Sequence, residues 1–392
     1  MANLDLTRYF VGVIAKRLSE VEIVRQKSNQ REFNSTQAMK VLLGDHRKTF
    51  DAQFIYLCDE MEPFTEKIAM TWYDARENNP SRSEFRLFYS GNGIATKSQI
   101  GDCLFLARKK DDKLLAVVTP KGSMMEKRMA WLFGIKPANM FASGDLSSSD
   151  DSCVAVACML LRLLGVSDDE TDDAVVSALR KKYVNIVPSF KEITVSARLL
   201  SGFTPEGLTA DDALTGWMNY LEKTMRAAKK YLVSLSSSVM TKQKTAFQSL
   251  TGYINSDWQS EALFLYLKVL LNRRSLRYDE YRTSGKGMMI LPGWQEKVRG
   301  TYSLGRISTV KTASLIDAAS LSVPTDTREV YLLTLDPGIT DEVIQIMTEK
   351  KIIPVVPSSI QKLYTVGNRF MFLSVEELLL VLSEKQEGRY GN

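Results

Sequence analysis

The chain has 392 residues, of which 44% are hydrophobic and 25% are charged, as in an ordinary globular protein of two or three domains. Its 51 basic and 46 acidic residues give a net charge of +5, which permits a polyanionic partner without requiring one. No apolar run is long enough to span a bilayer, and charges interrupt the apolar part of the N-terminal segment. We therefore expect a cytoplasmic protein with no signal peptide and no membrane partner.

The few cysteines and the single histidine limit the possible chemistry. No CxxC pair occurs, so neither a disulfide framework nor a zinc site is expected, and free thiols in a reducing compartment are the simplest interpretation. With His46 alone, histidine-dependent acid–base or Ser-His-Asp chemistry is not expected. A metal, if used, would be a hard ion on carboxylates. The cysteines are Cys58, Cys103, Cys153 and Cys158.

From about residue 50 to 135 the pattern predicts β structure. Short apolar segments with broad alternation are separated by turn residues, which is typical of a small barrel or sandwich. A helix over 124–135 follows and is expected to end near Gly134. The expected strands are 52–59, 68–75, 84–91, 102–109 and 113–120.

The rest of the chain is predicted to be largely helical, and its last part is predicted to alternate between strands and helices. Residues 142–152 have the composition of a linker. Strand 329–336, helix 340–350 and strand 351–359 predict a parallel pair in an α/β domain, because a crossover helix joins parallel strands. The expected helices are 153–166, 167–183, 210–235, 260–274 and 374–385.

Several segments occur in the order found in one protein family. LLTLDPGIT, a helix and IIPVVPSSIQKLY close the chain, VPSFKEI and SEALFLYLKVLL precede them, and RSEFRLFYSGNG and GDCLFLARK lie in the first part. Together they resemble the EcoRII-type (type IIE) restriction endonucleases over about residues 27–384. The resemblance implies an α+β multi-domain protein with a B3-like β-barrel DNA-binding domain (1–145), a linker with helices (146–180) and a restriction-endonuclease-like α/β domain of the PD-(D/E)XK type (181–392).

The resemblance also implies partners and residues that read DNA. Double-stranded DNA, a homodimer through the C-terminal domain and further subunits of a defence complex are the expected partners. Arg can contact guanine or phosphate, Asn and Gln can contact adenine, and Glu can accept from cytosine. The alternative is a solvated turn with scattered charges. The expected DNA-reading residues are Asn29, Gln30, Asn34, Arg82, Glu84 and Arg86.

The nuclease site of this family needs a helix glutamate, a strand aspartate, a lysine on the next strand and a distal glutamate, and its carboxylates hold magnesium. Here Phe264 or Lys268 stands at the helix position and Met288 at the aspartate position. Lys311 survives as a remnant, and the distal position falls near Val323 and Pro324. The resemblance therefore implies an inactive nuclease fold with no cofactor.

An alternative is a rebuilt site that holds Mg²⁺ on acids that have moved, namely Asp279, Glu280, Glu296 and Asp317. Two D/E-x-K matches, 111–113 and 349–351, are discounted as a hairpin tip and a helix end. Three hypotheses follow: a DNA-binding pseudo-nuclease in anti-phage defence or regulation, an active Mg²⁺-dependent endonuclease, and an interaction protein that reads no DNA.

Overall fold

The chain forms two compact units, Met1–Ser167 with Gly338–Thr340, and Asp168–Pro337 with Asp341–Asn392. The computed structural model describes residues 5–23, 31–59, 61–78, 81–91, 93–135, 143–146, 154–166, 173–200, 209–255, 258–283, 286–291, 305–309 and 330–387. The boundary at residue 167 lies within the segment 146–180 that the sequence analysis set apart. The division into three domains stays a proposal.

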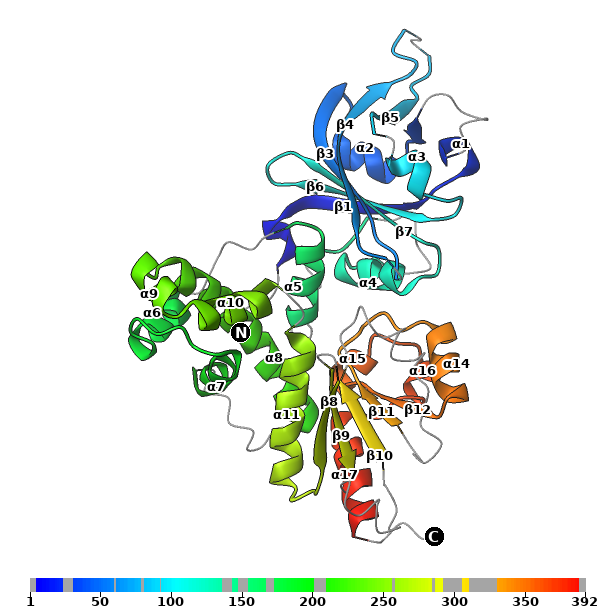
Figure 1. The fold of residues 1–392 in the computed structure, drawn as a ribbon. Coiled ribbons are helices and arrows are strands. Elements are labelled where there is room, and N and C mark those ends of the chain that lie inside the picture. The colour runs from blue at the N-terminus through cyan, green and yellow to red at the C-terminus, as the bar shows by residue number, and fades with distance from the viewer. Residues whose placement is uncertain are drawn as a thin grey trace. The chain divides into compact units, whose positions relative to one another are not determined.

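The first unit is built on a curled sheet of seven strands (Figure 1). The strand order is β1-β6-β7-β3-β4-β5-β2, and neighbours are antiparallel except for the parallel pair β3 and β7. The strands are β1 (Phe10–Arg17), β2 (Glu32–Asn34), β3 (Lys48–Tyr56), β4 (Phe64–Asp74), β5 (Phe85–Tyr89), β6 (Cys103–Lys109) and β7 (Leu114–Thr119).

One face of this sheet carries the hydrophobic core, because alternate residues of a strand point to the same side. Phe54, Trp72 and Leu87 are fully buried in that core, on three neighbouring strands. Thr36 and Ser123 cap helices α2 and α4 by accepting the N–H of the third helical residue. The helices of this unit are η1 (Leu6–Arg8), α1 (Glu20–Ile23), α2 (Gln37–Leu43), α3 (Gly93–Lys97), α4 (Met124–Leu132) and α5 (Val154–Leu163).

The five strands expected from the sequence are confirmed as β3 to β7, and the helix over 124–135 is confirmed as α4. The chain leaves α4 through Gly134, whose φ of +62° suits glycine. The edge strands β1 and β2 were not predicted. β1 has four consecutive buried residues, Val13 to Lys16, and β2 has three residues, so neither shows the alternation that predicted the others.

The second unit combines a helical module with a five-stranded sheet. The module consists of α6 (Asp173–Lys182), α7 (Phe190–Leu200), α8 (Ala210–Val233), α9 (Ser237–Lys242) and α10 (Lys244–Asn255). Helix α11 (Gln259–Arg273) follows. The remaining elements are β8 (Asp279–Thr283), β9 (Lys286–Leu291), β10 (Gly305–Thr309), β11 (Val330–Leu333), α14 (Asp341–Glu349), β12 (Ile352–Val355), α15 (Ser358–Gln361), α16 (Val366–Arg369) and α17 (Val375–Gln386).

The sheet of the second unit has the order β12-β11-β10-β9-β8. β8, β9 and β10 form an antiparallel meander, whereas β10, β11 and β12 run parallel. The expected parallel pair joined by helix α14 is therefore confirmed. Asp211 ties α8 to this layer, because its buried carboxylate accepts the N–H groups of Ser358, Val375 and Glu376.

The mixed α+β class is confirmed in both units, whereas the B3-like nature of the first stays a proposal. Among the described residues no helix is long and apolar enough to cross a membrane. Cys58, Cys103 and Cys158 are free thiols, and burial raises the pKa of Cys103 above that of an exposed cysteine.

Candidate nucleic-acid interface

Three polar side chains lie in a row across the outer face of the N-terminal sheet. Asn34 on β2 is directly opposite Arg86 on β5, and Arg86 is directly opposite Tyr73 on β4. The residue beside each of them faces the core, so these three share the other face. The inward residues are Phe33, Leu87 and Trp72.

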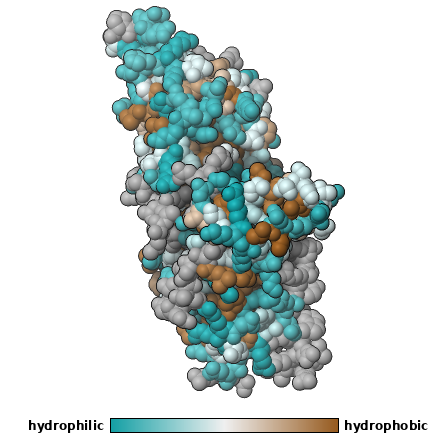
Figure 2. Space-filling model, turned by 90° about the vertical axis from the view of Figure 1, so that its left-hand side faces the viewer, coloured by the Kyte–Doolittle hydropathy of each residue, from teal (hydrophilic) through white to brown (hydrophobic). Residues whose placement is uncertain are grey.

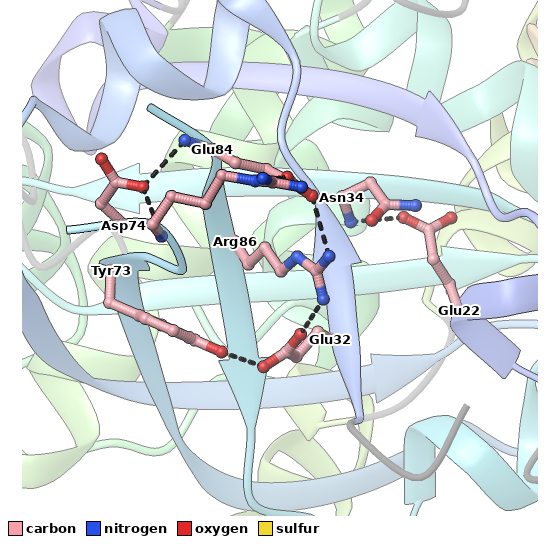
Figure 3. A network of polar contacts seen from close by, with 8 residues as sticks. Glu22, Glu32, Asn34, Tyr73, Asp74, Glu84 and Arg86 are labelled. Carbon is pink, nitrogen blue, oxygen red and sulfur yellow. Dashed lines mark hydrogen bonds and ion pairs between the residues drawn. The ribbon is translucent and has the colours of Figure 1, made fainter. Parts of the chain in front are cut away.

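Arg86 is held between two carboxylates (Figure 3). Its Nη1 donates to Glu32 at 2.9 Å and its Nη2 donates to Glu84 at 2.8 Å. The other oxygen of Glu84 accepts from Nε of Arg76 at 2.6 Å, and the hydroxyl of Tyr73 donates to Glu32. The five side chains form one network, which we call the Arg86 cluster.

The contacts within the Arg86 cluster shift the pKa of Glu84, Arg86 and Tyr73. Hydrogen bonds from Arg86 and Arg76 lower the pKa of Glu84 to about 2, so this carboxylate is charged at neutral pH. Bonds to Glu84 and Glu32 raise the pKa of Arg86. Burial, and then the bond to Glu32, raise the pKa of Tyr73 to about 12, so its hydroxyl remains a donor.

The connection between β4 and β5 is closed by Asp74. Its Oδ1 accepts the N–H of Arg76 at 2.9 Å and the N–H of Glu84 at 2.8 Å. The bond from the Glu84 backbone is the main reason that the pKa of Asp74 is lowered. Arg82 lies in this connection with its side chain exposed, and it makes no hydrogen bond or ion pair within the described residues.

An open hollow of about 410 Å³ adjoins the Arg86 cluster. The exposed guanidinium of Arg47 lies over the ring of Tyr73, 5.6 Å from its centroid, on one side of this hollow. Two arginines therefore border it, and Arg76 is already paired with Glu84. The hollow is lined by Arg47, Tyr73, Asp74, Ala75, Arg76, Glu77 and Asn78.

Glu22 orders the backbone on both sides of residues 24–30. It is buried and forms an ion pair with the equally buried Lys16. Its carboxylate also accepts the N–H of Ser19 at 2.8 Å and the N–H of Asn34 at 2.7 Å, as Figure 3 shows for Asn34. Asn29 and Gln30, which were expected to read DNA, lie outside the described residues.

The structure thus brings together three of the residues expected to read DNA, Asn34, Glu84 and Arg86. Arg82 is in the same β4–β5 connection but is not bonded to them. DNA contact by any of these residues stays a prediction.

Glu32, Tyr73 and Arg76 belong to the Arg86 cluster but were not predicted from the sequence. Glu32 and Asn34 are two residues apart, so a strand at this point would have placed both on the outer face. Tyr73 joins through the register of β4 with β5, which a single strand does not reveal.

In the second unit, Lys268 occupies the position where the sequence analysis looked for an acid. It lies on α11, four residues after the buried Phe264, and its Nζ forms an ion pair with Glu280 on β8. Met288 lies on β9, between β8 and β10. The carboxylate of Glu280 is therefore bound to the ammonium group that stands at the expected helix position.

The described residues around Lys268 do not fit a magnesium ion. Mg²⁺ takes oxygen ligands that include carboxylates, and the carboxylate of Glu280 is already engaged. In the part of the chain that the structure describes, no three His, Cys, Asp or Glu side chains come together as a metal site. The other positions considered lie outside that part, namely Glu296, Lys311, Asp317, Val323 and Pro324.

The two D/E-x-K matches lie where the sequence analysis expected. Residues 111–113 form the turn between β6 and β7, with Asp112 at a φ of +66° and Lys113 paired with Asp111 at 2.9 Å. Residues 349–351 end α14. Both interpretations are confirmed.

Residues 258–379 match the model of a family described as EcoRII C terminal. The C-terminal region of this chain is similar to that family over these residues. The match begins just before α11 and ends on α17, so the EcoRII-type domain includes the whole five-stranded sheet with Lys268, Glu280 and Met288. The EcoRII-type resemblance expected from the sequence is therefore confirmed for residues 258–379.

Comparison with solved structures gives weaker likenesses. Metal-depleted Ecl18kI in complex with uncleaved, modified DNA is 13% identical, with 56% of this chain and 85% of that chain covered and a TM-score of 0.38. A PspGI–substrate DNA complex is 13% identical, with 51% and 94% covered and a TM-score of 0.36. Because these identities and TM-scores are low, the family assignment rests on the EcoRII-type match and not on these structures. No curated protein matches the chain.

Proposed function

We propose that this protein binds double-stranded DNA through the outer face of its N-terminal sheet and that its EcoRII-type domain does not cleave DNA. Such a pseudo-nuclease would act in anti-phage defence or as a DNA-binding regulator. The observation that carries the proposal is the ion pair between Lys268 and Glu280 in a domain of a nuclease family.

The Arg86 cluster suits DNA recognition because it holds a planar guanidinium in one orientation. Each Nη of an arginine carries two hydrogens, and Glu32 and Glu84 each accept one hydrogen from a different Nη of Arg86. A guanidinium fixed in this way can donate two parallel bonds to guanine or phosphate at a small entropic cost. Arg82 is exposed and unpaired among the described residues. It suits a phosphate contact, which needs a less exact side-chain position than a base contact does.

The binding claim is tested by a duplex titration over a series of salt concentrations. Arg82→Ala with Arg86→Ala should weaken binding and reduce the salt slope by about 1 to 2, because each phosphate contact contributes about 0.9. Lys97→Ala with Lys121→Ala removes two exposed cations of the same unit from other elements and is the matched control. Equal binding by the double arginine variant and the wild type contradicts the assignment.

The loss of cleavage follows from the charge at the nuclease position. An ammonium beside the carboxylate of Glu280 opposes the cation that the chemistry of this family requires. Lys268→Glu with Met288→Asp restores acids at both positions and is the combination with which metal-dependent cleavage could return. Lys311→Ala in the wild type should change no cleavage.

The same assays separate the two alternatives. Metal-dependent cutting by the wild type would support an active endonuclease with acids that have moved, beginning with Asp279, Glu296 and Asp317. An absence of salt-sensitive DNA binding would support an interaction protein that kept the fold. A homodimer through the EcoRII-type domain and partnership with other defence subunits are part of the proposal, and size measurement with and without DNA tests the former.

A further inference from the structure

The positive charge of the chain is concentrated in the helical module. Residues 173–255 contain eleven Lys and Arg against six Asp and Glu, an excess of +5 that equals the net charge of the whole chain. From Lys223 to Asn255 there are six cations and no acid. The residues outside 173–255 therefore carry no net charge, and the net positive charge of the chain equals that of this module.

The fold brings the basic segments of the module together. The side chain of Gln243, between Lys242 and Lys244, donates to the carbonyl of Asn185 at 2.8 Å and accepts the N–H of Val187 at 2.9 Å. These bonds join the α9–α10 junction to the segment between α6 and α7. The end of α8 reaches the same segment, because the hydroxyl of Tyr231 donates to the carbonyl of Ile186 at 2.7 Å.

Most of the cations on these segments are exposed and unpaired. Lys230 pairs with Asp173 and Lys182 donates to the hydroxyl of Ser196, but the others have no ion-pair partner in the described part of the chain. Those others are Arg180, Lys181, Lys191, Lys229, Lys242 and Lys244, all exposed. We call these six residues the basic face.

The helix dipole explains only some members of the basic face. A cation at the end of a helix is favourable, which suffices for Arg180, Lys181 and Lys242. Lys191 and Lys244 stand at the start of α7 and α10, where a positive charge opposes the dipole. Their placement favours an external anion that compensates the cost.

The surface beside these cations is also partly apolar. Val184, Ile186 and Val233 are exposed by 65%, 54% and 80%, at the point where α8 meets the α6–α7 segment. Figure 2 shows hydrophobic side chains among hydrophilic ones on the side of the molecule that carries these helices. Deoxyribose offers apolar contact between phosphates, so a nucleic-acid backbone matches both kinds of group.

We propose that the basic face binds the sugar–phosphate backbone of double-stranded DNA without regard to sequence. It would give the protein a second DNA contact besides the Arg86 cluster, and in this it rests on the proposed function. The contact neutralises phosphates and reads no base, so it contributes affinity and salt dependence rather than specificity.

The test uses the full chain and two variants that remove equal charge. Lys181→Gln, Lys242→Gln and Lys244→Gln together should weaken binding to a duplex of arbitrary sequence at least about tenfold at about 50 mM salt and reduce the salt slope by about 2 to 3. The control variant is Lys121→Gln with Lys350→Gln and Lys362→Gln, which should bind nearly as the wild type. Circular dichroism melting of both variants checks that they are folded.

Each outcome of this test has a definite meaning. An unchanged salt slope in the module variant, or an equal loss in the control, overturns the inference. Poly-glutamate that competes as well as duplex DNA of equal charge overturns it in favour of an acidic protein partner. If the module variant binds as the wild type while Arg82→Ala with Arg86→Ala loses binding, the inference fails and the proposed function stands. If the wild type binds no duplex, both fail.

Discussion

Lys268 on α11 and Glu280 on β8 form an ion pair inside the EcoRII-type domain, with their side chains 29% and 36% exposed. The pair satisfies both charges within the protein. The ammonium of Lys268 compensates the negative charge of Glu280, as a metal ion compensates carboxylates in a metal-dependent nuclease. Unlike a metal ion, it cannot activate water as a Lewis acid. This relationship is the basis of the proposal that the domain binds without cutting.

Reversal of the charge at residue 268 should make the domain respond to metal. Lys268→Glu places a second carboxylate beside Glu280, so in a chelator we expect the free energy of unfolding to fall by about 1–2 kcal/mol. Mg²⁺ or Mn²⁺ should then raise the Tm of the variant by several degrees, because a bound cation stabilises the folded state. Lys268→Met, which loses the ion pair without adding an acid, is the control and should show no such rise. An identical metal response in the two variants contradicts the placement of Lys268 beside Glu280.

Glu84 should affect sequence preference more than affinity. It orients Arg86 and Arg76, yet as an anion it also repels phosphates. In Glu84→Gln we therefore expect the preference for the best duplex over a scrambled one to fall about tenfold, since a fixed arginine contributes discrimination of this order. Binding to the scrambled duplex should stay equal or become tighter. A uniform loss across both duplexes would mean that Glu84 only maintains the fold.

The same carboxylate predicts a pH dependence of stability. The pKa of Glu84 is lowered to about 2 in the folded protein, against 4.5 for an ordinary glutamate. Because the folded pKa is depressed, the stabilisation is fully present above about pH 4.5 and is lost as the pH falls towards 2. Urea unfolding from pH 6 to pH 3 should show a shallower loss of stability in Glu84→Gln than in the wild type. Parallel curves would show that the arginines do not hold this carboxylate.

Asp211 should be essential for the packing of α8 against α15 and α17. Its buried carboxylate accepts three backbone N–H groups, from Ser358, Val375 and Glu376. Asp211→Asn removes charge-assisted bonds from buried donors, and we expect a loss of about 2–4 kcal/mol in the free energy of unfolding. The exposed neighbour provides the control, because Asp212→Asn should cost less than about 1 kcal/mol. Similar losses for the two variants, measured by thermal melting, contradict this role.

An element of the fold can be predicted from the sequence when its own residues show which positions are buried or where it begins. β4 alternates along its length, and α17 begins with a Ser374–Glu377 capping box, so both were visible in the sequence. β1 was not, because it lies at a sheet edge yet is covered on both faces from Val13 to Lys16, and Lys16 is buried there through its pairing with Glu22. A buried ion pair of this kind masks the hydrophobic pattern.

The sequence indicated which residue types suit the candidate site, but it did not reveal the strand pairing that brings them together. Arg86 and Asn34 have side chains that suit base contact, and the resemblance placed both in DNA-reading segments. Tyr73 and Glu32 come from strands whose pairing with β5 joins distant parts of the chain. The ion pair of Lys268 with Glu280 could not be predicted for the same reason, since the two side chains come together only when α11 packs against β8.

The measurement that tests the central claim most directly is metal-dependent cleavage under conditions in which binding is complete. Plasmid and phage DNA would be saturated with the wild-type protein, as judged by gel shift, and then given Mg²⁺ and, separately, Mn²⁺. The account predicts shifted DNA that remains uncut with either metal. Discrete metal-dependent fragments would contradict it, and would direct the search for carboxylates to Asp279, Glu296 and Asp317.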